Sequence, residues 1–272
     1  MPAVQFTRES PEVGRVVVSD PPVGLMTGAT VHGLADVVAG LAGDSDLKVL
    51  VFESSTDDFF LNHFDLARID DFPGGAAWLD LVVALSEARY ITVAVIRGRT
   101  RGGGNELALA LDLRYASRQR ARFGQPEVGT AVVPGGGGTE RLPRQIGRDR
   151  ALEVILTSAD YDADTAERWG WVTRALDDDQ LDEYVAGVIG RLASFDGDAL
   201  ATAKAMVNRA TLPPKADLES AYRTFEERMA SPSYRARAAA GAARLDDDQL
   251  LALELELGEF IGAAARRRVA DA

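Results

Sequence analysis

The feature that most constrains the fold is the alternation of short β-branched runs with helical patterns over the first half of the chain. The runs that have the character of buried strands are VGRVVV from Val13, LKVLVF from Leu47, ITVAVI from Ile91 and LRYA from Leu113. Between them, apolar residues recur at helical spacing, as they do over residues 35–42 and 79–85. Parallel strands need connections of about a dozen residues or more, and helices supply connections of that length. The sequence therefore predicts an α/β first half with parallel strand pairing.

The character of the chain changes after about Leu176. The segments that follow are Ala-rich and charged, and they have helical spacing with hardly any β-branched runs. The predicted helices cover residues 178–194, 198–210, 215–229 and 246–268. We expect a domain boundary near residue 195, with a catalytic domain over residues 1–195 and a helical domain over residues 196–272.

The ends of these predicted helices carry recognisable signals. Phe195-Asp196-Gly197-Asp198 and Leu212-Pro213-Pro214 have the composition of turns, and Asp198 is the expected N-cap of the helix after it. The acidic runs at residues 177–179 and 246–248 each precede a helix, where negative charge complements the positive end of the helix dipole. These runs are therefore interpreted as solvated caps.

Composition restricts the partners of this chain. The 272 residues carry a formal net charge of -12, which argues against a nucleic acid or an anionic membrane as partner. The chain has no cysteine, so disulfides, thiolate nucleophiles and thiolate zinc sites are excluded. No stretch approaches the roughly 20 apolar residues that span a bilayer, and no secretory signal precedes the first strand. We expect a cytoplasmic protein without a metal or a resident cofactor.

Two glycine clusters, at residues 102–104 and 135–138, invite comparison with phosphate-binding loops. Neither completes the GxGxxG pattern, and neither is followed by the Lys-Ser/Thr pair of a nucleotide P-loop. The first cluster lies between a buried strand and the helical run ELALALD, so the amides of Gly103 and Gly104 are expected to point outward at a helix N-terminus. That geometry suits a developing anion. A tight strand-to-helix turn explains the three glycines equally well.

Two carboxylates accompany the first glycine cluster. Glu106 lies in the first turn of the predicted helix, and Glu127 follows in the loop Phe123-Gly124-Gln125-Pro126-Glu127. A helix, a short strand and a return loop between them would bring the chain back to the same edge. Two carboxylates in one cleft can divide into an ionised base and a protonated acid. Alternatively, Glu106 caps its helix and Glu127 lies at the surface, and the residues alone leave both interpretations open.

The stretch from Ile91 to Leu176 resembles the enoyl-CoA hydratase/isomerase (crotonase) superfamily. The segments that carry the resemblance are RGGGNELALALDLRYAS, ARFGQPEVGTAVVPGGGGTERLPRQIGRDRALEVILT and DADTAERWGWVTRAL. With weaker similarity on either side, the resemblance covers about residues 13–210. It implies an α/β spiral of repeated ββα units, followed by a C-terminal helical domain that mediates formation of a trimer, often as a dimer of trimers.

The resemblance also implies roles for individual residues. In this family a thioester carbonyl lies between two backbone amides, which match Gly103 and Phe64 here. Glu106 matches the carboxylate that activates water, and Glu127 matches the one that protonates the α-carbon, so that water adds across a 2-enoyl double bond. Because both carboxylates are present, a hydratase-type lyase is favoured over a double-bond isomerase. Coenzyme A enters as part of the acyl thioester substrate.

One departure from the family lies before Asp65. Asn62-His63-Phe64 replaces the small residues usual there, which is expected to narrow or reshape the acyl pocket. His63 is either a polar surface residue or a pocket residue that contacts substrate. This departure leaves two further readings open. One is a specialised relative that acts on a bulky or non-CoA substrate, and the other is a non-catalytic oligomeric binding protein on the same scaffold.

A second departure is the arginine-rich entry to the glycine turn, at Arg97, Arg99 and Arg101. These side chains could neutralise CoA phosphates or pair with carboxylates at a subunit contact. The residues expected to contact substrate are His63, Asp65, Arg101, Pro134 and Gly135.

Overall fold

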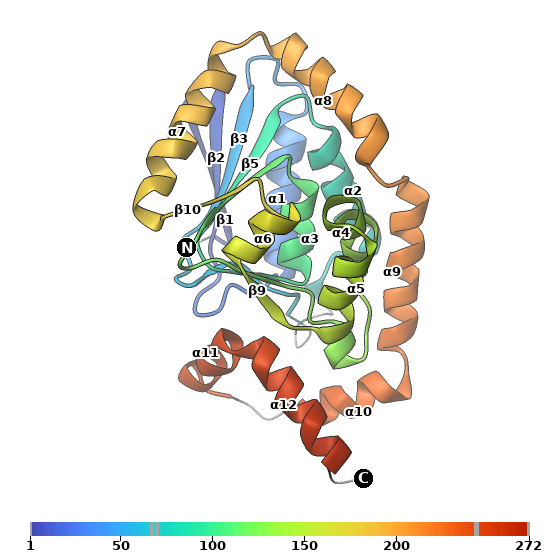
Figure 1. Ribbon diagram of the computed structural model, residues 1–272. Coiled ribbons are helices and arrows are strands. Elements are labelled where there is room, and N and C mark those ends of the chain that lie inside the picture. The colour runs from blue at the N-terminus through green and yellow to red at the C-terminus, as the bar shows by residue number, and fades with distance from the viewer. Residues whose placement is uncertain (1, 66–67, 69–70, 242–244, 271–272) are drawn as a thin grey trace.

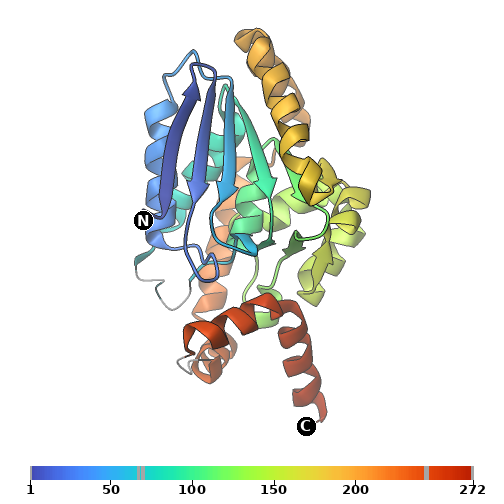
Figure 2. The ribbon, with the colours of Figure 1, turned by 90° about the vertical axis from the view of Figure 1, so that its left-hand side faces the viewer.

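The computed structural model describes residues 2–65, 68, 71–241 and 245–270. Its larger sheet has six strands in the order β1-β2-β3-β5-β7-β10. Their bounds are β1 Val4–Ser10, β2 Val13–Val18, β3 Val49–Ser54, β5 Ile91–Ile96, β7 Leu113–Ser117 and β10 Arg174–Leu176. The pairs from β2 to β10 are parallel, and β1 runs antiparallel to β2. Figure 2 shows the strands of this sheet side by side.

A smaller, four-stranded sheet has the order β4-β6-β8-β9. Its strands are β4 Phe59–Leu61, β6 Arg99–Arg101, β8 Arg122–Gly124 and β9 Asp160–Asp162. The first three pair in parallel, and β9 runs antiparallel to β8. Each turn of the chain thus adds one strand to the large sheet and one to the small sheet.

Helices complete these turns. The helices of the α/β part are α1 Gly28–Leu41, α2 Gly75–Glu87, α3 Gly103–Ala110, α4 Gly138–Ile146, α5 Arg148–Thr157 and α6 Ala163–Trp169, with a short 3-10 helix, η2, over Val128–Thr130. The order β3-β4-α2, then β5-β6-α3, then β7-β8 followed by α4 confirms the predicted spiral of ββα units. In Figure 1, α1, α2 and α3 lie on one face of the large sheet and α7 lies on the other.

The four predicted strands are confirmed as β2, β3, β5 and β7, with β3 beginning two residues later than its apolar run. The strands that the sequence did not indicate are β1 and the three-residue strands. β1 is an edge strand with mostly exposed side chains, so its sequence, VQFTRES, lacks the apolar pattern of a buried strand.

The C-terminal part is helical, as predicted. Its helices are α7 Asp178–Ser194, α8 Gly197–Thr211, α9 Lys215–Met229, α10 Pro232–Gly241, α11 Asp247–Leu255 and α12 Leu257–Ala270. The single helix expected over residues 246–268 is wrong, because the chain leaves helical geometry at Glu256, with φ -120° and ψ 25°. The helix α10 was not expected.

The capping prediction needs one correction. Asp196, rather than Asp198, is the N-cap of α8, because the Asp196 side chain accepts a hydrogen bond from the Ala199 amide. Asp198 lies in the first turn and pairs with Arg89. The second acidic run contains the N-cap of α11, since Asp246 accepts from the amide of Gln249 in a capping box.

The last two helices lie beyond the ends of the strands, away from the body of the large sheet (Figures 1 and 2). The side chains of β6 reach them: Arg99 donates to the Leu255 carbonyl at 3.0 Å, and Arg101 donates to the Glu254 carbonyl. Over the described residues, no helix is both long enough and apolar enough to cross a membrane.

Candidate active site

The first half of the site is the turn from β6 into α3. Gly102 has φ +51°, a conformation that favours glycine, and the helix begins at Gly103. Glu106 lies in its first turn and is only 1% exposed. Its Oε1 accepts hydrogen bonds from the amides of Gly136, at 2.8 Å, and Gly138, at 3.0 Å. Glu106 is therefore a buried carboxylate held by the second glycine cluster.

This contact explains why the second cluster is rich in glycine. A Cβ atom on Gly136 would lie 2.2 Å from Trp78 Nε1 and 2.4 Å from Glu106 Oε2. The backbone can approach the carboxylate closely only because no side chain is present. The cluster at residues 135–138 thus holds a carboxylate of the same chain, which agrees with the absence of a nucleotide-loop pattern.

Glu127 follows β8 and immediately precedes η2. Gln125 Nε2 donates to its Oε2 at 3.3 Å, while Gln125 Oε1 accepts from Asn105 Nδ2. Asn105 Oδ1 in turn accepts from Trp171 Nε1 at 2.9 Å. A Cβ atom on Gly102 would lie 2.9 Å from Glu127 Oε1, so the carboxylate lies over the glycine turn. This chain of polar contacts fixes the second carboxylate to the core.

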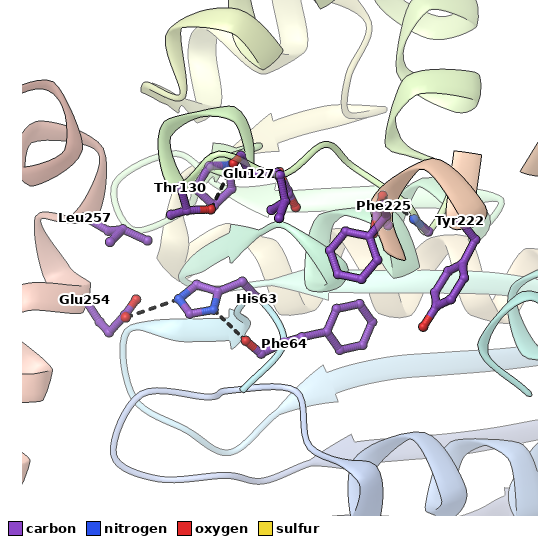
Figure 3. Close-up of a pocket in the computed structure, with 13 residues that line it drawn as sticks. His63, Phe64, Glu127, Thr130, Tyr222, Phe225, Glu254 and Leu257 are labelled. Atoms are coloured by element: carbon purple, nitrogen blue, oxygen red, sulfur yellow. Dashed lines mark hydrogen bonds and ion pairs between the residues drawn. The ribbon is translucent and has the colours of Figure 1, made fainter. Parts of the chain in front are cut away.

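Both carboxylates line one cavity of about 170 Å³. The other residues that line it are His63, Phe64, Pro126, Thr130, Val132, Gly135, Gly136, Tyr222, Phe225, Glu254 and Leu257. Most of these side chains are apolar, which favours the uncharged form of any acid that they enclose. Figure 3 shows Glu127 and Thr130 on one side of this cavity, with Tyr222 and Phe225 on another.

The pKa values of both carboxylates are raised, and that of Glu127 is raised further. Burial raises the pKa of Glu106 to about 7, against the opposing effect of the Gly138 and Gly136 amides. Burial, reinforced by the charge of Glu106, raises the pKa of Glu127 to about 8. The amides favour an ionised Glu106, and an ionised Glu106 favours a protonated Glu127. The pair can therefore hold one base and one acid near neutral pH.

The second half of the site is the segment after β4. The His63 carbonyl accepts from the Met26 amide, and the Asp65 amide donates to the Met26 carbonyl, both at 2.9 Å. These two hydrogen bonds fix the backbone on either side of Phe64. The Phe64 ring packs edge-on against Phe72 and Trp78.

The backbone amides of Phe64 and Gly103 have no hydrogen-bond partner among the described residues. The two residues are neighbours, since a Cβ atom on Gly103 would lie 2.9 Å from the Phe64 ring. The expectation that Gly104 also offers an outward amide is wrong, because that amide donates to the Asn62 carbonyl at 3.0 Å. Two amides, from different segments, therefore remain as donors: Phe64 lines the cavity, whereas Gly103 is not among the lining residues and lies against the Phe64 ring.

His63 lines the cavity with its side chain 25% exposed. Its Nδ1 lies 2.9 Å from the Phe64 carbonyl, and its Nε2 lies 3.2 Å from Glu254 Oε1 (Figure 3). The structure thus places His63 in the pocket rather than on the surface.

Among the other predicted substrate contacts, Gly135 lines the cavity, whereas Asp65, Arg101 and Pro134 do not. Asp65 pairs with Arg68 at 2.6 Å. Arg101 is 1% exposed and binds Asp160 through two of its nitrogens, so it cannot reach a phosphate in this conformation.

The other two arginines also bind groups of their own chain. Arg97 pairs with Asp178 and Asp182, and Arg99 binds the Leu255 carbonyl. Their role as a phosphate cluster is therefore not supported.

Four of the residues that line the cavity, Tyr222, Phe225, Glu254 and Leu257, come from the C-terminal helices and were not predicted from the sequence. Tyr222 and Phe225 lie three residues apart on α9, a spacing that indicates a core-facing stripe as readily as a pocket wall. Glu254 and Leu257 come from the far end of the chain, and their segment carries no motif. Within the described part of the chain, no group of three or more His, Asp or Glu side chains could hold a metal ion.

The site combines two carboxylates in one apolar cavity with two amides that have no hydrogen-bond partner among the described residues, on a ββα spiral. This combination defines a class of enzyme that stabilises negative charge as it develops beside a carbonyl group. The sequence profile of the family "Enoyl-CoA hydratase/isomerase" matches residues 8–239, and the chain belongs to this family of enzymes.

The chain resembles solved structures over most of its length. One is the crystal structure of a "putative enoyl-CoA hydratase" from Streptomyces avermitilis. It is 36% identical to this chain, with a TM-score of 0.88 and 96% coverage of both chains. Another is an enoyl-CoA hydratase from Mycobacterium avium subsp. paratuberculosis, with 26% identity, a TM-score of 0.81 and coverage of 88% of this chain and 98% of the other.

Curated relatives match over shorter stretches. A crotonyl-CoA hydratase from Syntrophomonas wolfei is 31% identical over 66% of this chain and 71% of its own length. A Rhizobium meliloti protein, named as a probable enoyl-CoA hydratase, is 42% identical, and the match spans about half of each chain, 51%.

Proposed function

We propose that this enzyme is an enoyl-CoA hydratase, a lyase that adds water across the double bond of a 2-enoyl thioester. The observation that carries the proposal is the pair Glu106 and Glu127, buried in one apolar cavity, with pKa values that burial raises to about 7 and about 8. Family membership and the names of the relatives support an acyl-CoA substrate. An isomerase that only moves a double bond needs one carboxylate, so the second one favours hydration.

In this mechanism the thioester carbonyl lies between the amides of Gly103 and Phe64. Ionised Glu106 takes a proton from water as the water oxygen bonds to the β-carbon, and protonated Glu127 delivers its proton to the α-carbon. Between these events negative charge gathers on the thioester oxygen as an enolate. Each amide stabilises that charge, and loss of one such donor typically costs about 2.7 to 4 kcal/mol.

The test is a hydration assay on purified protein with short and medium 2-enoyl-CoA thioesters, followed by the loss of enoyl absorbance. We expect turnover, and about 10²- to 10⁴-fold lower kcat for Glu106→Gln and for Glu127→Gln. Glu183→Gln, an exposed glutamate on α7, is the matched control and should leave kcat unchanged. Absence of turnover with every thioester, or unaltered kcat in both Gln variants, would contradict the proposal.

A thermal-shift measurement separates hydration from mere binding. A ligand that binds only the folded state raises the unfolding temperature by mass action. Stabilisation by CoA species without turnover would indicate a binding protein on this scaffold. Isomerisation of a 3-enoyl-CoA without hydration would indicate an isomerase, and turnover of a non-CoA thioester alone would indicate a specialised relative.

We also propose that the helices after residue 195 form an oligomerisation domain and that the chain assembles as a trimer or a dimer of trimers. Large apolar side chains exposed on this part of the chain, Met206 and Val207 on α8 and Phe260 on α12, support the proposal. Light scattering coupled to size exclusion tests it, and a monomer at micromolar concentration would exclude it.

A further inference from the structure

The two departures from the family pattern meet at one residue of the C-terminal region, Glu254. The first departure is the segment Asn62-His63-Phe64, and the second is the arginine-rich strand β6. Both contact the last turn of α11. The last carbonyls of a helix have no partner within the helix, and cationic side chains stabilise them. Arg99 binds the Leu255 carbonyl and Arg101 binds the Glu254 carbonyl, so β6 fastens the C-terminal end of α11 to the site.

This attachment buries the Glu254 carboxylate against the segment that carries Phe64. Glu254 is 4% exposed, and its Oε2 accepts from Asn62 Nδ2 at 2.8 Å while its Oε1 lies 3.2 Å from His63 Nε2. The Arg101 guanidinium stands 4.0 Å from the same carboxylate. A carboxylate with these donors around it is stable in its ionised form.

The hydrogen bonds of His63 determine its charge. A carbonyl oxygen can only accept, so His63 Nδ1, 2.9 Å from the Phe64 carbonyl, must carry a proton. An ionised carboxylate can also only accept, so Nε2 beside Glu254 must carry one as well. These two acceptors favour the imidazolium form of His63. Burial lowers its pKa, but the charge and hydrogen bond of Glu254 outweigh burial and raise the pKa overall.

The charged groups around this pair come from three elements. Arg101 of β6 opposes the charge on His63, and Asp160 of β9 neutralises Arg101. Glu127 faces His63 from the loop after β8, and the imidazolium charge lowers the pKa of Glu127 against the larger effect of burial. Glu254 is therefore the counter-charge that touches His63, whereas Glu127, protonated in the proposed mechanism, lies on the other side of the ring.

We propose that Glu254 is a positioning residue: it holds His63 in the form whose Nδ1–H donates to the Phe64 carbonyl, and so keeps the Phe64 amide directed at the substrate carbonyl. This proposal rests on the proposed hydratase function. Loss of the Glu254 charge then acts through His63 on the transition state and leaves the apolar walls of the cavity in place. The two Met26 hydrogen bonds remain, so the Phe64 amide is displaced rather than lost.

The first experiment does not depend on activity. The chain has two histidines, so His32→Gln assigns their ring signals in an NMR titration without ambiguity. We expect His63 to titrate at a clearly lower pH in Glu254→Gln than in the wild type, while His32 is unchanged. Glu259→Gln, a neighbouring exposed glutamate on α12, is the matched control and should leave both titrations as they are. Identical His63 titrations in the wild type and in Glu254→Gln would overturn the proposal.

The second experiment uses the hydration assay. Glu254→Gln and His63→Gln should each lower kcat about 10- to 100-fold with little change in KM, as expected for a misplaced donor. The double variant should be no slower than His63→Gln alone. Multiplicative losses in the double variant, or an effect confined to KM, would overturn the proposal. If Glu254→Gln does not fold, His63→Gln tests the same split between kcat and KM. If the wild type hydrates no thioester, the proposed function fails while the titration still tests the pair.

Discussion

The two halves of the candidate site are built in different ways. The half at Gly103 and Glu106 belongs to the spiral, and its partners at residues 136–138 lie about 30 residues away along the chain. The half at Phe64 is held by Met26 and by Glu254, which is 191 residues from His63. The spiral thus supplies the proposed acid and base by itself, whereas the second amide depends on how α11 docks.

Among the changes that test this difference between the halves, the largest effect is expected where the two halves join. Gly104 donates its amide to the Asn62 carbonyl, and a Cβ atom there would lie 1.9 Å from the Leu61 carbonyl oxygen. Since both neighbours are backbone, Gly104→Ala should push α3 away from β4 and separate the two amides. We expect about a 10³-fold loss of kcat and destabilisation of about 3 kcal/mol by chemical denaturation. Near-wild-type activity would mean that the halves tolerate displacement.

A smaller loss is expected from the carboxylate cradle alone. Gly136→Ala would place a methyl group 2.4 Å from Glu106 Oε2 and should displace that side chain, lowering kcat about 10²-fold. The matched control is Gly187→Ala on α7, where a Cβ atom meets nothing within 4 Å. That control should retain activity and gain about 0.4 to 1 kcal/mol. Equal activity in both variants would refute the role of the cradle.

The contrast between the halves also explains what could be predicted from the sequence. Strand and helix periodicity correctly predicts the elements beside three features of the site: the glycine turn, Glu106 in the first helical turn and Glu127 in the return loop. Glu254 lies in LALELELGEF, where nothing distinguishes it from a solvated helix position. Its role depends on the break at Glu256 and on docking to β6. Such contacts between distant segments leave no periodic signal.

The wall that α12 contributes can be tested through substrate affinity. Leu257 is 9% exposed and lines the cavity, so Leu257→Ala should remove apolar contact with the acyl chain. We expect kcat/KM to fall about tenfold, mainly through KM. Leu245→Ala, on an exposed leucine before α11, is the control and should not change KM. A drop in kcat at constant KM would instead assign Leu257 to the placement of the Phe64 half.

The smallest expected effect is on stability as a function of pH, and it has opposite signs in the two halves. Burial raises the pKa of Glu127 to about 8, so the folded state binds this proton more tightly than the unfolded state does. The resulting stability is complete below about pH 4.5 and is lost as the pH rises to about 8. Glu127→Gln cannot ionise, so its unfolding temperature should exceed that of the wild type by about 3–8 °C at pH 8, with the difference vanishing near pH 5.

Glu254 should behave in the opposite way. Burial alone would raise its pKa, but the charge and hydrogen bonds of His63 and Asn62 lower it overall. Its contribution is present above the unfolded pKa and is lost as the pH falls through the lower, folded value. Glu254→Gln should therefore be less stable than the wild type at neutral pH and approach it in acid, while Glu183→Gln follows the wild type throughout. Opposite pH dependences are expected because the folded state holds a proton on Glu127 but holds Glu254 as an anion. If the stability of Glu127→Gln and that of Glu254→Gln, each relative to the wild type, changed with pH in the same direction, this difference between the two halves would be refuted.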